Sequence, residues 1–175
     1  RQQALELAFE SALVITDPNM QSLALSYLRP YLAKTPALLN NLDSSEVVAP
    51  ELIGSLVQTG VLTPSRGLSL AEVIRDETAR SRALAALGPY LTNQLLDEAR
   101  IVASTMRDEV ARAQALAALA PFLSSRSREQ ALSDALDAVQ HMESEVARAQ
   151  ALAELAPQLT SDFLRTALTV ARTIS

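Results

Sequence analysis

Residues able to carry out chemistry are scarce in this chain of 175 residues, which has a single histidine and no cysteine. A zinc site needs several Cys, His or carboxylate ligands, and a Ser-His-Asp arrangement needs a histidine as its base. The one histidine, His141, stands next to the apolar position of Met142, and we interpret it as an exposed or partly buried surface residue. The sequence therefore predicts no catalytic residue, no metal and no cofactor.

Phosphate loops and paired carboxylates give no stronger signal. The segment TGVLTPSRG (59–67) has neither the spacing nor the lysine of a phosphate-binding loop. Most carboxylates stand at expected helix starts, among them Asp76, Asp108 and Glu145. A negative charge there favours the helix dipole by about 0.3–1 kcal/mol when exposed. We therefore expect a protein that is not an enzyme.

One arrangement of charges recurs along the chain. Each of three arginines follows a glutamate by three residues: Arg80, Arg112 and Arg148 follow Glu77, Glu109 and Glu145. On a helix this spacing places both side chains on one face. Two interpretations remain open, an ion network that joins repeated segments, or an arginine row that binds an anionic peptide or phosphate. The glutamates favour the network because they neutralise the row.

These charges belong to a longer repeated segment. Its copies read RDETARSRALAALGPYL (75–91), RDEVARAQALAALAPFL (107–123) and ESEVARAQALAELAPQL (143–159), and LRPYL around Pro30 marks a fourth. Bulky, small and proline positions keep the same register, which indicates tandem repeats. The residue after the proline is Tyr31, Tyr90, Phe122 or Gln158. We expect core packing there, or a row of ligand-contacting aromatics, with Gln158 partly exposed at a repeat edge.

Each repeat is predicted to contain two helices. The first runs from near Glu109 to about Leu123, and it is apolar or small nearly all round, which is typical of a helix packed on several sides. The late proline ends or bends it. A second helix follows in NQLLDEARIVASTM, REQALSDALDAVQHM and SDFLRTALTVARTI, with Asn93, Ser127 and Ser161 as expected N-caps. Four extra residues near SSRSREQ are expected to lengthen the turn between the helices.

The predicted fold is all-α, an α-solenoid of four to five stacked antiparallel helix pairs with about ten helices in one domain, residues 1–175. Its parts are a first repeat (1–32), an irregular helical insert or degenerate repeat (33–74), and regular repeats at 75–106, 107–142 and 143–175.

The repeat length and the late proline resemble HEAT-like α-solenoid repeats. EVARAQALAALAPFL is similar to the Ala/Leu-rich tandem helical repeats of large bacterial multidomain proteins, which often lie beside a signalling NTPase or sensor module. The resemblance covers about residues 16–32 and 75–174. Tetratricopeptide repeats have a similar length, but their Trp-Gly-Tyr signature is missing and the chain has no Trp. The resemblance implies binding and scaffolding, and it supplies no catalytic residues.

Charge and hydropathy narrow the expected partners and location. The net charge of −5 disfavours nucleic acid and anionic membranes as partners. No apolar run reaches the roughly 18 residues of a membrane span. The chain begins at Arg1 already in a helical pattern, so we expect a fragment of a larger cytoplasmic protein.

A binding surface is expected where the copies differ. In HEAT-like folds the second helices line the concave face, and their outward positions here change from acidic to basic along the chain. The candidate partner-binding residues are Asp97, Glu98, Ile101, Asp134, Asp137, Gln140, His141, Arg165, Thr169 and Arg172. Such a groove suits an extended or helical protein segment of mixed charge, from another chain or another domain. Ordinary variation of a solvated surface is the alternative interpretation.

The functional hypothesis is a non-enzymatic interaction, scaffold or regulatory sensor region of a larger protein. One alternative is a structural array that self-associates through an exposed repeat end, formed by Phe163, Leu164, Leu168 and Val170. Another is a ligand-binding or lyase-type enzyme on a HEAT-like fold, since folds of this kind do host enzymes.

Overall fold

The computed structural model describes residues 2–15, 17–32 and 50–172, and in these ranges the chain contains ten α-helices and no strand. The helices are α1 (Gln2–Leu13), α2 (Pro18–Leu32), α4 (Pro50–Gln58), α5 (Pro64–Val73), α6 (Glu77–Leu87), α7 (Asn93–Ser104), α8 (Glu109–Leu119), α9 (Ser125–His141), α10 (Glu145–Leu155) and α11 (Ser161–Ala171). The prediction of an all-helical chain is confirmed. The helix expected around PALLNNL, residues 36–42, lies outside the described residues.

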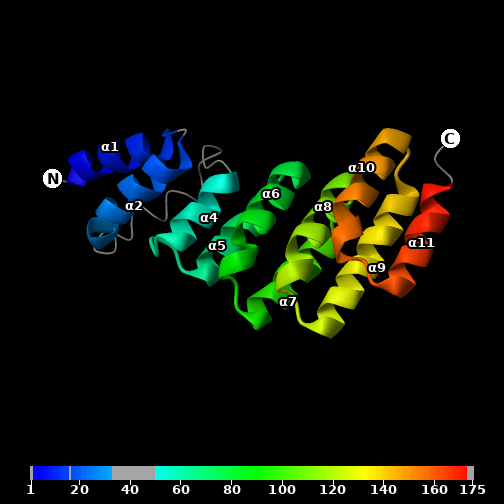
Figure 1. Ribbon diagram of the computed structural model, residues 1–175. Helices are drawn as coiled ribbons and strands as arrows, with labels where there is room; N and C mark the ends of the chain where they lie inside the picture. The colour runs from blue at the N-terminus through cyan, green and yellow to red at the C-terminus, as the bar shows by residue number, and fades with distance from the viewer. Residues whose placement is uncertain (1, 16, 33–49, 173–175) are drawn as a thin grey trace.

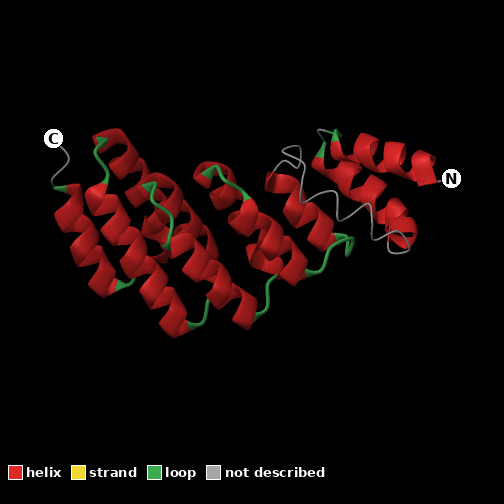
Figure 2. Cartoon of the chain, turned by 180° about the vertical axis from the view of Figure 1, so that it is seen from behind, coloured by secondary structure: helices red, strands yellow, loops and turns green. Residues whose placement is uncertain are grey.

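The helices lie side by side in chain order (Figure 1). One layer contains α4, α6, α8 and α10, and each of these first helices contacts the next one along the layer. A second layer contains α5, α7, α9 and α11, which also contact one another in sequence. Each second helix packs on the first helix of its own pair, and Figure 2 shows the short loops that join them. Interior pairs are therefore covered on both sides.

Each first helix of the regular repeats ends in a 3-10 turn that contains the proline. These turns are Gly88–Tyr90, Ala120–Phe122 and Ala156–Gln158. Pro121 has no N–H, so the carbonyl of Ala117, four residues earlier, cannot receive the usual helical hydrogen bond. The side-chain Nε2 of Gln158, from the following helix pair, donates to that carbonyl at 2.9 Å. A half-buried glutamine is accommodated at this otherwise aromatic position because it bonds to the preceding pair.

The second helices begin earlier than predicted. Their N-caps are Thr92, Ser124 and Thr160, one to three residues before the expected caps Asn93, Ser127 and Ser161. Both Thr92 and Ser124 directly follow the last leucine of the preceding segment, so the connections have equal length. The four extra residues instead lengthen α9, which has 17 residues against 12 in α7. The prediction of a longer turn is wrong because Ser124 can cap the helix at once.

Alanine and leucine allow the first helices to approach closely. Ala115 and Leu116 have no exposed surface, and Ala111 and Ala113 are each 1% exposed. The contact between α4 and α6 leaves no room for a side chain at Gly54, because a Cβ added there would lie 2.6 Å from the carbonyl oxygen of Ala86. The core is thus a continuous strip of small and branched side chains between the two layers.

Removing part of Leu116 tests this packing. Leu116→Ala should lower the free energy of unfolding by about 2–5 kcal/mol, because it leaves a cavity covered on all sides. Leu152→Ala is the matched control, since Leu152 holds the same place in α10 but is half-buried, and its loss should be smaller. Urea unfolding measures both. Equal losses would contradict coverage of α8 by helices on both sides.

Candidate interaction face

The arginine positions of the repeats bind backbone carbonyls at the end of the preceding helix. Arg80 Nε donates to the carbonyl of Ile74 at 2.9 Å, and Arg112 Nη1 donates to that of Met106 at 3.0 Å. Gln21 holds the corresponding place in α2, and its Nε2 donates to the carbonyl of Ile15 at 3.0 Å. The same contact is thus made three times, once by an uncharged side chain.

The glutamate position contacts the next helix pair. Glu77 Oε2 accepts hydrogen bonds from the backbone N–H groups of Arg107 at 2.8 Å and Asp108 at 2.7 Å. Asp108 in turn caps α8, because its Oδ1 accepts from the N–H of Ala111 at 2.8 Å. The turn from Met106 to Asp108 is therefore held by the preceding pair and by its own first helix.

These contacts indicate the structural role of the recurring glutamate and arginine residues. Arg80 and Arg112 are half-buried, and their guanidinium groups donate to main-chain oxygens. This arrangement favours a role in connecting successive helices over the binding of an external anion. Glu109 and Arg148 are half-buried at the corresponding positions, whereas Glu145 in the last pair is exposed. The sequence spacing placed Glu77 and Arg80 on one face, but the partners of each come from other segments.

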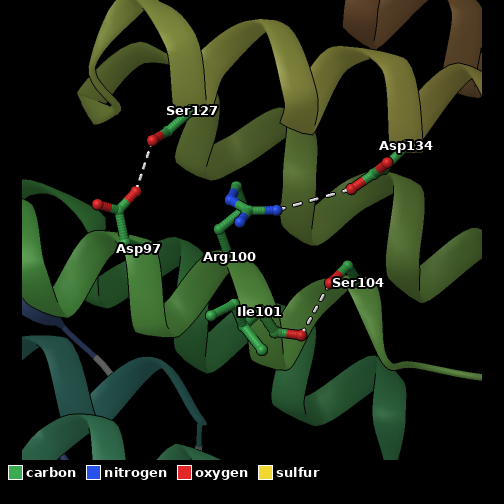
Figure 3. A network of polar contacts seen from close by, with 6 residues as sticks. All are labelled: Asp97, Arg100, Ile101, Ser104, Ser127 and Asp134. Carbon is green, nitrogen blue, oxygen red and sulfur yellow. Dashed lines mark hydrogen bonds and ion pairs between the residues drawn. The ribbon is translucent and has the colours of Figure 1, made fainter.

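Two of the candidate partner-binding residues connect α7 to α9 (Figure 3). Asp97 Oδ1 accepts a hydrogen bond from Ser127 Oγ at 2.6 Å. Asp134 Oδ2 lies 3.8 Å from Arg100 Nη1, and the Arg100 side chain is only 16% exposed. Sequence reasoning missed Arg100, and it predicted Ser127 as an N-cap and not as a partner of Asp97. Arg100 had a usable signal, since a charged residue interrupts the apolar stripe of α7 there.

The other candidates lie on the outer surface of the second helices. All of them are exposed: Glu98 and Ile101 on α7, Asp137, Gln140 and His141 on α9, Arg165 and Thr169 on α11, and Arg172 directly after α11. His141 Nδ1 lies 2.8 Å from the carbonyl oxygen of Asp137 and 3.7 Å from its Oδ1. Thr169 Oγ1 donates to the carbonyl of Arg165, and Glu98 Oε1 accepts from Gln94. Each of these contacts joins residues of one helix, so it orients the side chain without burying it.

A hollow of about 180 Å³ lies between α9 and α11 on this surface, beside the contact of the two helices. Its lining residues are Ser133, Leu136, Asp137, Gln140, Phe163 and Thr166. Small-molecule sites usually enclose about 300–1,000 Å³, so this space suits one side chain of a larger partner. Leu136 is 2% exposed and Phe163 is half-buried, whereas Asp137 and Gln140 are exposed. Phe163 is therefore the main apolar wall of the hollow, and its rim is polar and negatively charged.

A metal centre and a membrane span have no candidate residues in the part of the chain that the structure describes. Among the described residues, no group of three or more His, Cys, Asp or Glu side chains could hold a metal ion. Within those residues, no helix has the length and apolar character needed to cross a membrane. Comparison of the chain with protein-family models, curated proteins and solved structures gave no match.

The joint between the first and second regular repeats can be tested at Glu77. Glu77→Ala should lower the free energy of unfolding by about 1 kcal/mol, because two N–H groups at the start of α8 lose a charged acceptor that is partly screened by solvent. Glu145→Ala is the matched control at the first position of α10, where the side chain is exposed. Thermal and urea unfolding should show little change for Glu145→Ala. An equal effect of the two changes would mean that the helix dipole, and not the joint, sets the value.

Proposed function

We propose that the chain is an α-solenoid of HEAT-like repeats and serves as a non-enzymatic interaction or scaffold region. The layered contacts of α4, α6, α8 and α10 and of α5, α7, α9 and α11 support the solenoid. Stacked helix pairs offer a long continuous surface for a partner segment. The Arg80 and Arg112 contacts support a structural role for the most regular residues, which leaves the variable positions for recognition.

The single observation that carries the binding proposal is the hollow between α9 and α11. Its apolar wall at Phe163 can contact the aliphatic stem of one long side chain, and its polar rim, with Asp137 and Gln140, can contact the polar end of that side chain. Ile101 on α7 adds an apolar side chain, 53% exposed, to the same helix layer. A partner segment would therefore place one long side chain in the hollow and run along the second helices.

The chemistry of the rim specifies that side chain. The Asp137 carboxylate, 68% exposed, favours a lysine or arginine whose aliphatic stem contacts Phe163. Gln140 can donate to or accept from the backbone of the partner. We therefore propose a protein segment, extended or helical, with a basic side chain flanked by apolar residues.

A display library of random peptides, selected on the purified chain, tests the proposal. The selected peptides should carry a lysine or arginine next to apolar residues, and Asp137→Lys should weaken their binding at least about tenfold, because it reverses the charge that meets the anchor. Calorimetry or fluorescence anisotropy of one selected peptide gives the affinity. Asp97 and Asp134 are left unchanged, since they join α7 to α9.

Glu10→Lys is the control for overall charge. Glu10 is exposed on α1, far along the chain from the hollow. Its replacement by lysine changes the net charge by the same amount as Asp137→Lys. Binding should persist in this variant. Peptides without a basic residue, or equal losses in both variants, would contradict a specific site at Asp137.

A further inference from the structure

The hollow between α9 and α11 has a counterpart between the preceding two second helices, α7 and α9. Both α7 and α9 lead into a buried methionine, Met106 or Met142, which gives a spacing of 36 residues between their corresponding positions. The buried Ala135 of α9 recurs as the buried Ala167 of α11, which gives a spacing of 32 residues for the next step. The residues of the two grooves can therefore be compared position by position.

Five of the six residues that line the hollow correspond to residues of the network in Figure 3. The corresponding residues are Asp97 and Ser133, Arg100 and Leu136, Ile101 and Asp137, Ser104 and Gln140, and Asp134 and Thr166. Both grooves therefore belong to the same face of the second-helix layer. Ile101 is 53% exposed on this face although two second helices follow α7, so the face is open to solvent within the array.

An arginine of the protein itself occupies the groove between α7 and α9. Arg100 extends from α7 toward α9, and its Nη1 lies 3.8 Å from Asp134 Oδ2 (Figure 3). Its side chain is only 16% exposed, so the aliphatic stem lies between the two helices and the charged end reaches the edge of the groove. At the corresponding position α9 has Leu136, which has no guanidinium group. The hollow therefore lies where an arginine side chain lies one groove earlier.

The hollow presents hydrogen-bond acceptors on both of its sides. The exposed Asp137 carboxylate and the side-chain carbonyl of Gln140 belong to α9, and the hydroxyl of Thr166 belongs to α11. In the preceding groove, by contrast, the buried Nε of Arg100 has no hydrogen-bond partner among the described residues. A guanidinium group has five N–H donors in one plane, whereas the ammonium of lysine is a compact point charge with three. Acceptors on opposite sides of the hollow therefore favour a guanidinium group.

The ring of Phe163 gives a second preference for arginine. The corresponding residues are Leu95 in α7 and Ala131 in α9, so the two preceding second helices have no aromatic ring at this position. Guanidinium groups are planar and stack on aromatic faces, whereas an ammonium group is more strongly hydrated. The apolar wall of the hollow therefore also favours arginine over lysine.

We propose that the anchoring side chain of the partner segment is an arginine, bound between α9 and α11 as Arg100 is bound between α7 and α9. Its aliphatic stem enters the hollow, its guanidinium group stacks on Phe163, and its N–H groups donate to Asp137 on one side and Thr166 on the other. This inference rests on the proposed function, and it narrows the anchor from a basic side chain to one residue type.

Three versions of one peptide from the display selection test the proposal, with arginine, lysine or citrulline at the anchor position. Citrulline keeps the shape of arginine without its charge. In calorimetry on the full 175-residue chain, the arginine peptide should bind at least about fivefold tighter than the lysine peptide, because arginine alone stacks on the ring and reaches acceptors on both sides. The citrulline peptide should bind the most weakly of the three.

Phe163→Leu tests whether the preference arises in the hollow. Leucine already stands at this position in α7, as Leu95, so the variant should keep its helical circular dichroism. The ratio of the arginine and lysine affinities should fall at least about twofold, because arginine loses the stacking surface while lysine loses little. Phe122→Leu is the matched control, since Phe122 is 39% exposed in the turn after α8 and does not line the hollow. It should leave the ratio unchanged.

The outcomes separate this inference from the proposed function. Equal affinities of the arginine and lysine peptides for the wild-type chain would overturn the arginine assignment and leave a basic anchor in place. An unchanged ratio in Phe163→Leu would also overturn the assignment, because the preference would then arise outside the hollow. A citrulline peptide that binds as tightly as the arginine peptide, or a selection that yields no basic peptide, would overturn both proposals.

Discussion

The turns between helix pairs impose the constraint on which the rest of the structure depends. The last carbonyls of one helix and the first N–H groups of the next have no partners within their own helices. Arg112 binds the carbonyl of Met106, while Glu77 binds the N–H groups of Arg107 and Asp108 from the preceding pair. Because these bonds cross from one pair to the next, they fix the stagger at which the alanine faces pack.

The prolines create a second demand of the same kind. Pro121 leaves the Ala117 carbonyl without its helical donor, and Gln158 supplies one from the neighbouring pair. Arg128 of α9 also donates to the carbonyls of Ala120 at 2.8 Å and Pro121 at 3.2 Å. Side chains of neighbouring segments thus supply donors to carbonyl groups at helix ends.

Sequence reasoning predicted what depends on local pattern and missed what depends on tertiary partners. The proline register and the alanine-leucine periodicity gave the helices and the buried face around Leu116. The spacing of Glu77 and Arg80 suggested a pair within one helix, yet both bind backbone groups of other segments, which no spacing reveals. Ser127 was expected to cap α9, but it follows Ser124 in the first turn and bonds to Asp97. Asp137 and Gln140 were predicted on the outer face, whereas the hollow beside Phe163 required the packing of α11 on α9.

Amide hydrogen exchange tests most directly the claim that each pair is stabilised by its neighbours on both sides. It should be measured at a concentration where the chain sediments as a single copy. The account predicts that the amides of Leu116 and Leu119 in α8 exchange far more slowly than those of Leu164 and Leu168 in α11, which open locally at the end of the array. Equal protection of the two helices would contradict the account, because it would show one cooperative unit that owes nothing to neighbour contacts.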